Sequence, residues 1–190
     1  MQPSHPLTIT SNSGLLRVIA CECHVCAAFD PSNLAPGQAA PSLVPFQAIW
    51  DTGATASVIS QAVVDACGLK PTGMQQVHGV GGVAVAETYL VNIRLPNMVG
   101  FLNLNVTKGM LPPGTPMLIG MDIISQGDLS ITNNGGRTVF SFRYPSIGTT
   151  DFVAEHHEQM RREQQQAPRT TSGRGVIPPH ILRNGKRRGR

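Results

Sequence analysis

The sequence lacks any apolar run that approaches the about 20 residues a helix needs to cross a membrane. Its first six residues contain no basic stretch followed by an apolar block, so no secretory signal is predicted and a cytoplasmic location is the default expectation. There is no internal repeat, no glycine-rich loop followed by Lys and Ser or Thr, and no motif that supports a serine or cysteine triad. These absences argue against a membrane protein, a phosphate-loop enzyme and a Ser or Cys hydrolase.

Basic charge is scarce outside one end of the chain. Residues 1–150 hold six Lys and Arg against seven Asp and Glu, whereas residues 151–190 hold nine against four. The net charge of +4 therefore belongs to the tail and says little about the folded part. The tail also lacks the interleaved aromatic residues that stack on bases, so we do not expect specific binding of nucleic acid.

Cysteine is nearly absent, but three of the four residues lie close together at Cys21, Cys23 and Cys26, around His24. A closed zinc site needs four ligands, and no second Cys-x-x-Cys or His-x-His pair follows at a standard distance. If this segment is a strand, Cys21 and Cys23 share one face and Cys26 lies on the other. We therefore expect buried or redox-sensitive thiols rather than a metal site, and a small core residue at Cys67.

What the chain does contain is glycine and proline, 20 and 15 residues, with 41% hydrophobic residues. This composition favours a turn-rich all-β protein of one domain with tails. Residues 1–43 are predicted to hold a polar, irregular start, a strand over 15–20 with a continuation into the cysteine cluster left open, and a Pro/Gly-rich linker. Residues 44–149 form the predicted domain. Residues 150–190 are predicted to form a short helix over 152–166, begun by Asp151, and then a disordered basic tail.

Within the domain the pattern alternates short apolar runs with turn residues. Strands are predicted over 47–50, 56–59, 101–107 and 117–120, with hairpins over 75–95 and 129–142. Helices are predicted over 61–67, with Ser60 as N-cap and Gly68 just beyond the end, and over the residues after Gly120.

The most informative segment places Asp51-Thr52-Gly53 directly after the apolar strand that ends at Trp50. Hydrolysis of a peptide bond needs a group that takes a proton from water and a group that gives one to the substrate. Two carboxylates that share one proton meet this need, because like charges held close together cannot both ionise. The chain carries a single copy of the loop, so the second carboxylate must come from another chain across a two-fold axis.

Residues 51–59, with the sequence DTGATASVI, resemble the catalytic segment of the retropepsin-like aspartic proteases, and Leu118–Ile124 is similar to the second signature of that family. The likeness spans roughly residues 44–144, with a glycine-rich hairpin between the two signatures. It implies a closed acid-protease barrel or sandwich with one or two short helices. It also implies a homodimer that binds a peptide or protein substrate and uses no cofactor. Trp50 departs from the smaller aliphatic residue that is usual in the family, and the segment before residue 45 is extra.

The resemblance also implies roles for matched residues. Asp51 would be the catalytic carboxylate, Thr52 would bond across the dimer axis, and Gly120 would let the second signature pass close behind the loop. The remaining implied residues support the loop or form a mobile flap over the substrate: Gly53, Ala54 and Thr55 in the loop, and His78, Gly79, Val80, Gly81 and Gly82 in the flap.

Two interpretations of the function remain at this point. The first is an aspartic endopeptidase that favours mildly acidic pH, because its pair of carboxylates must hold one proton. The second is a catalytically silent dimeric module that holds peptides on the same fold. Asp122 is interpreted as a helix-start cap or the partner of an arginine, and His78 as a surface residue of the flap.

Overall fold

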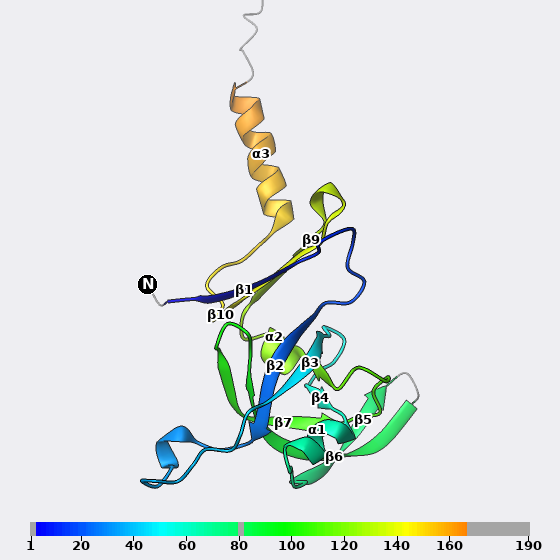
Figure 1. Ribbon diagram of the computed structural model, residues 1–190. Helices are drawn as coiled ribbons and strands as arrows, with labels where there is room; N and C mark the ends of the chain where they lie inside the picture. The colour runs from blue at the N-terminus through cyan, green and yellow to red at the C-terminus, as the bar shows by residue number, and fades with distance from the viewer. Residues whose placement is uncertain (1–2, 80–81, 167–190) are drawn as a thin grey trace, which may run out of the picture. The chain divides into compact units, whose positions relative to one another are not determined.

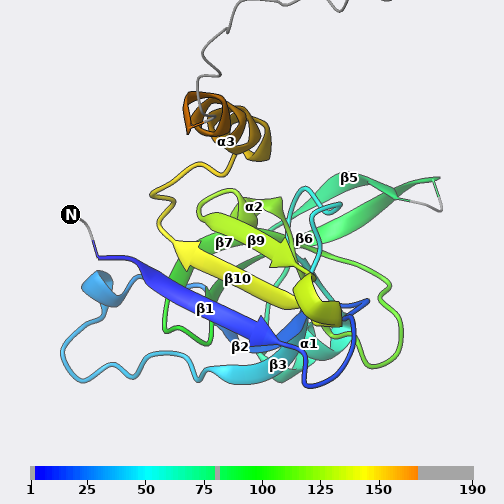
Figure 2. The same cartoon turned by 90° about the horizontal axis from the view of Figure 1, so that it is seen from above.

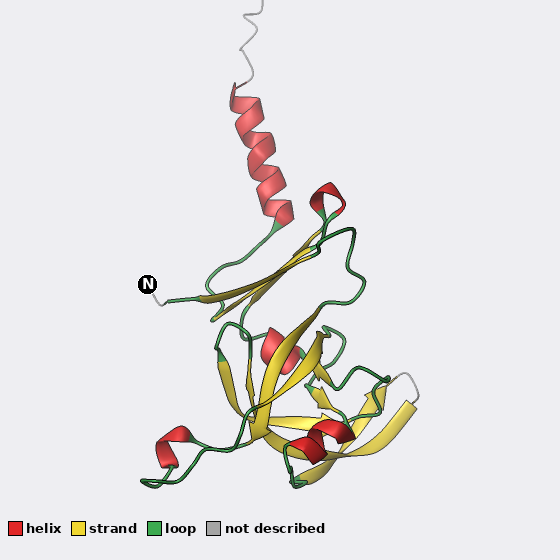
Figure 3. Ribbon diagram, in the orientation of Figure 1, coloured by secondary structure: helices red, strands yellow, loops and turns green. Residues whose placement is uncertain are grey.

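The computed structural model describes residues 3–79 and 82–166, and strands dominate it (Figure 3). The chain divides into two compact units, residues 1–149 and 150–190. The strands are β1 (His5–Thr10), β2 (Ala20–Ala27), β3 (Val44–Trp50), β4 (Val58–Ile59), β5 (Gly73–Gly79), β6 (Gly82–Arg94), β7 (Gly100–Lys108), β8 (Met117–Ile119), β9 (Asp128–Thr132) and β10 (Val139–Tyr144). The α-helices are α1 (Gln61–Ala66), α2 (Met121–Ile124) and α3 (Phe152–Gln166), and the 3-10 turns are η1 (Pro31–Asn33) and η2 (Asn134–Gly136).

Six of the strands close into a barrel in the order β2-β3-β8-β4-β7-β6, and β2 pairs with β6 to complete the ring. β5 extends the sheet beyond β6 as the outer arm of a hairpin (Figure 1). Closure leaves most strand edges paired, which removes the unpaired backbone groups that make open sheets prone to aggregate. The closed all-β fold expected from the sequence is confirmed.

A separate three-stranded sheet, β1-β10-β9, lies over one end of the barrel (Figure 2). Its inner face contributes Phe140 and Phe142, both fully buried, and their rings lie 4.9 Å from that of Trp50 at the end of β3. Aromatic rings at such distances bury large apolar areas and favour tilted arrangements like these. The small sheet is therefore packed directly behind the strand that delivers Asp51.

The N-terminal expectations were wrong in two respects. The polar start expected to be irregular forms β1, because alternate residues Leu7 and Ile9 pack against the core while the residues between them face solvent. The strand predicted over 15–20 is a loop, with Leu15 and Val18 more than half exposed, and pairing begins only at Ala20. Both β1 and β2 belong to the same compact unit as residues 44–149.

Most of the helix ends predicted from the sequence agree with the structure. α1 begins after Ser60, and Gly68 follows it with φ of +60°. Ser60 makes no side-chain capping bond, however, and its buried hydroxyl has no protein partner. In the second unit, the carboxylate of Asp151 accepts bonds from the N–H groups of Val153 and Ala154, which caps α3 as expected. No described helix is long and apolar enough to cross a membrane, and residues 167–190, where the basic tail was predicted, lie outside the described residues.

Candidate active site

Asp51 stands at the end of β3, where the barrel strand stops and a tight loop begins. Its N–H donates to the carbonyl of Ile119 at 2.9 Å, so the residue is still anchored to β8. Its Oδ1 accepts the N–H of Gly53 at 2.9 Å, and its own carbonyl accepts the N–H of Ala54 at 3.2 Å. The carboxylate is thus held in one orientation by the backbone that follows it, at the end of a buried, rigid strand.

The tip of this loop faces solvent. Thr52, Gly53 and Thr55 are exposed, Asp51 and Ala54 are half-buried, and the loop is followed by fully buried Ser57. A Cβ added to Gly53 would lie 3.1 Å from Oδ1 of Asp51, so the glycine leaves room for the carboxylate. One chain therefore presents an oriented carboxylate at the exposed tip of a loop.

Gly120 lies immediately behind the loop. A Cβ added there would approach the carbonyl carbon of Ala56 to 2.5 Å and its oxygen to 2.6 Å, so no larger residue fits without moving backbone. The next residue, Met121, donates its N–H to the carbonyl of Ala54 at 2.8 Å. The structure brings Gly120 and the loop together in the close approach that the sequence resemblance implies.

Asp122 lies in the first turn of α2, where its Oδ1 accepts the N–H of Ile123 at 3.0 Å, and it meets no arginine among the described ion pairs. Its carboxylate accepts the N–H of Ser57 at 2.9 Å and the hydroxyl of Ser57 at 2.8 Å. The bond to Ile123 agrees with the helix-start role expected from the sequence, whereas the arginine partner was wrong. The bonds to Ser57 were not expected, because they come from a segment 65 residues earlier, which helix-end rules do not consider. Ser57 was not singled out from the sequence, although a polar residue inside an apolar strand was a visible signal.

The hairpin predicted to close over the site is formed by β5 and β6, in register from Gly73 and Thr88 to Gly79 and Gly82. His78 and Gly79 are exposed on β5, and Gly82 begins β6 with φ of +106°, which favours glycine. Val80 and Gly81, which the flap prediction also names, lie outside the described residues. The hairpin is therefore present, and its two described arms end at Gly79 and Gly82.

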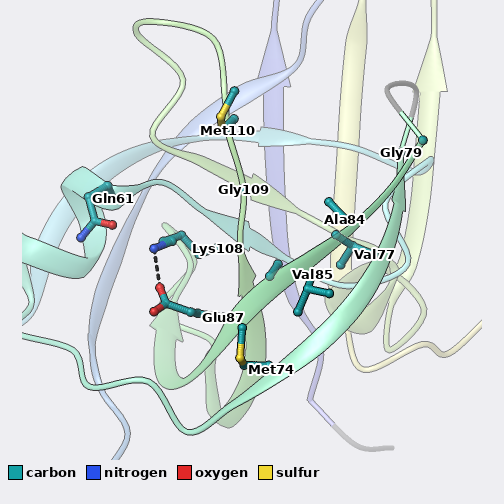
Figure 4. A pocket seen from close by; sticks show the side chains of 12 residues that line it. Gln61, Met74, Val77, Gly79, Ala84, Val85, Glu87, Lys108, Gly109 and Met110 are labelled. Atoms are coloured by element: carbon teal, nitrogen blue, oxygen red, sulfur yellow. Dashed lines mark hydrogen bonds and ion pairs between the residues drawn. The ribbon is translucent and has the colours of Figure 1, made fainter.

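A pocket of about 880 Å³ opens between this hairpin and the chain that leaves β7 (Figure 4). Its lining is mostly apolar and includes Met74, Val85 and Met110, which are all more than half exposed. Lys108 and Glu87 form an ion pair in its wall, and the hydroxyl of Tyr89 donates to the same Glu87 oxygen at 2.9 Å. The bond from Lys108, then the bond from Tyr89, holds the pKa of Glu87 below its usual range. Asp51 does not line this pocket.

The cysteines of β2 are buried rather than exposed at a surface site, and Cys21 and Cys23 belong to the hydrophobic core. Cys21, Cys23 and Cys26 are buried, and Sγ of Cys21 accepts the indole N–H of Trp50 at 3.3 Å. Burial raises the pKa of Cys23 to about 12. A group of three or more potential metal ligands is not found within residues 3–79 and 82–166.

Comparison with known proteins agrees with this geometry. Residues 42–126 match the family described as gag-polyprotein putative aspartyl protease. None of the curated proteins matches the sequence.

Several solved structures resemble the fold. A retropepsin-like aspartic protease from Rickettsia conorii is 14% identical, with 75% of this chain and 97% of that chain covered and a TM-score of 0.44. The EIAV protease complexed with the inhibitor HBY-793 is 22% identical, with coverage of 43% and 75% and a TM-score of 0.37. The retroviral protease-like domain of Ddi1 from Leishmania major is 18% identical, with coverage of 57% and 89% and a TM-score of 0.32. Likenesses this distant do not bear on the activity of this chain.

Proposed function

The chain carries a domain of the retropepsin-like aspartic protease family, and from this premise we propose that it is an aspartic endopeptidase that works as a homodimer. Water attacks the scissile carbonyl after losing a proton to the pair formed by Asp51 of each subunit, and the same pair returns a proton to the departing amine. The observation that carries the proposal is the geometry of the Asp51 loop. The loop presents an oriented carboxylate at an exposed tip, and the backbone at Gly120 packs directly against the loop.

The exposure of the Asp51 loop also supports the proposal of a homodimer. A single carboxylate cannot share a proton with a like group, so one subunit holds half of the proposed site. The exposed Thr52 stands beside Asp51, where its hydroxyl can bond to the partner loop across a two-fold axis. Dimer formation would cover this polar loop and exclude water from the reacting atoms.

The β5–β6 hairpin supplies the proposed substrate-binding arm. An extended peptide can pair with the backbone of such a hairpin and place alternate side chains in apolar pockets. The pocket beside Val85 and Met110 is suited to an apolar side chain, because its one charged pair is already neutralised within the protein. The glycines at the hairpin tip would allow the arm to open and close over the peptide.

The proposal is tested by comparing the wild type with Asp51→Asn, which keeps the shape of the side chain and removes the shared proton chemistry. Both proteins are incubated with a peptide library at about pH 5, and cleavage is followed by mass spectrometry. The variant is expected to cleave about a hundred-fold to ten-thousand-fold more slowly while its circular dichroism and sedimentation match the wild type. Identical fragments from both proteins would refute the enzyme. A wild type that stays monomeric at high concentration would refute the shared site.

The pocket gives one observation in favour of a second function, because an apolar binding site that excludes Asp51 could hold peptides without cleaving them. A silent peptide-binding module would bind library peptides with equal affinity in the wild type and in Asp51→Asn, and neither would release fragments. Isothermal titration with the peptides retained by the protein separates this outcome from catalysis.

A further inference from the structure

Behind the Asp51 loop, one carboxylate holds the last residue of the loop by two bonds. Ser57 is completely buried, and Asp122 lies in the first turn of α2. The N–H of Ser57 donates to Oδ2 of Asp122 at 2.9 Å, and the Ser57 hydroxyl donates to Oδ1 at 2.8 Å. Bonds to a charged acceptor are shorter and stronger than neutral ones.

The same hydroxyl connects the loop to Gly120. Oγ of Ser57 accepts the N–H of Gly120 at 3.1 Å. A serine hydroxyl has a single proton, and an ionised carboxylate can only accept. Donation toward Asp122 therefore turns a lone pair of the oxygen toward Gly120, and the direction of this short chain of bonds is set by Asp122.

These bonds join the Asp51 loop to residues 119–122, where the two segments are packed too closely to move past each other. The loop is tied at its start by the bond from Asp51 N–H to Ile119 and near its middle by the bond from Met121 N–H to Ala54. Gly120 contacts the backbone at Ala56 so closely that even a methyl group would not fit. The third attachment, at Ser57, is made by side-chain hydrogen bonds. It holds the end of the loop against the same four residues, 119–122.

We propose that Asp122 is a positioning residue for catalysis: acting through Ser57, it fixes the Asp51 loop against α2 and so sets the place of the catalytic carboxylate. The inference rests on the proposed protease function for its kinetic consequences. Asp122 acts through geometry, and its negative charge takes no part in the proton sharing of the Asp51 pair.

Three variants distinguish an effect on the position of the Asp51 loop from an effect of the charge of Asp122. Asp122→Ala removes both acceptors, Ser57→Ala removes the hydroxyl, and Asp122→Asn keeps one oxygen that can accept the Ser57 N–H while removing the charge. With a peptide that the wild type cleaves, Asp122→Ala and Ser57→Ala are expected to lower kcat about ten-fold to a hundred-fold. KM stays within about two-fold, because groups behind the loop do not touch substrate. Asp122→Asn is expected to recover most of kcat with an unchanged pH profile.

A measurement that needs no activity tests the same inference. Hydrogen exchange of the backbone amides in residues 51–57 and 119–122 is expected to rise about ten-fold or more in Asp122→Ala and Ser57→Ala. Exchange in β6 and β7 stays at the wild-type rate. Asp128→Asn is the matched control: its carboxylate, at the start of β9, also accepts several bonds, from Arg143 of β10 and from the N–H groups of Ile147 and Gly148, and the change is expected to leave the loop amides unchanged.

The outcomes are distinct. A wild type that cleaves no peptide refutes the protease, and the exchange data then decide the inference alone. Equal exchange in the loop and in β6 would show a general loss of stability and overturn the positioning role. A shifted pH profile in Asp122→Asn would show that Asp122 acts by its charge, which also overturns it. If Asp122→Ala does not fold, the Ser57→Ala and Asp122→Asn data carry the same decisions.

Discussion

At the scale of single residues, Trp50 shows how the site is built on the core. The residue is 8% exposed, and its ring contacts Phe140 and Phe142 while its N–H bonds to Cys21. A large side chain in the position before Asp51 therefore fills the space between the barrel and the three-stranded sheet. The Trp50 side chain thus supports the Asp51 loop from the core side and does not point toward the proposed substrate.

Buried thiols permit a prediction on chemical reactivity. Burial raises the pKa of Cys23 to about 12 and that of Cys67 to about 11, so neither thiol forms much of the reactive thiolate near neutral pH. We expect native protein at about pH 8 to react very slowly with iodoacetamide, with half-buried Cys67 modified before Cys23. Denatured protein, as the control, should be alkylated at all four cysteines. Rapid native labelling of Cys23, mapped by mass spectrometry, would contradict the burial described.

The bonds to the Asp128 carboxylate predict that the stability of the fold depends on pH. Bonds from the Ser146 hydroxyl, the Ile147 N–H and Arg143 hold the pKa of Asp128 well below its usual range. Because the folded value lies below the unfolded one, this stabilisation is complete above about pH 4 and is lost as the pH falls further. Asp128→Asn should lower the melting temperature at neutral pH and reduce its further fall in acid. A melting curve with the wild-type acid dependence would count against this network.

At the scale of elements, the contact between Gly120 and the Asp51 loop leaves no space for a side chain. Gly120→Ala places a methyl group against the backbone of Ala56, and overpacking of this kind costs about 1–3 kcal/mol. We expect a lower free energy of unfolding and a loss of peptide cleavage, measured by urea denaturation and by the library assay. Gly100→Ala is the matched control, since its added methyl group meets no atom within 4 Å. Equal effects of the two changes would contradict the close approach.

At the scale of the whole molecule, the small sheet joins distant parts of the chain. β1 pairs with β10 along six residues, from His5 with Tyr144 to Thr10 with Val139. Removing residues 1–11 would expose one edge of β10 and uncover the side of the core that holds Phe140 and Phe142. The family match begins only at residue 42, so β1 lies outside the matched residues.

Deletion of residues 1–11 is therefore expected to lower the melting temperature and to increase aggregation, because an unpaired strand edge is a template for association. Differential scanning calorimetry and light scattering measure the two effects. Removal of residues 150–190, which are assigned to the second unit, serves as the control and is expected to leave the melting of residues 1–149 unchanged. A deletion of residues 1–11 that melts like the full chain would refute the role of β1.

The sequence by itself determined what depends on neighbouring residues. Asp51 after an apolar strand, Gly68 after α1, Asp151 before α3 and the turn between β9 and β10 were all predictable, because short-range sterics and hydrogen bonding act within a few residues. The likeness of residues 51–59 and of Leu118–Ile124 to one family then predicted a closed β fold and the meeting of the two segments.

Tertiary structure alone decided the rest. The sequence pattern missed β1, because a strand with one weakly apolar face forms only when β10 is there to pair with it. It missed the role of Asp122, because the bonds to Ser57 join residues 65 positions apart. Long-range contacts of this kind depend on how the barrel closes, and they decide how firmly the predicted carboxylate at Asp51 is held.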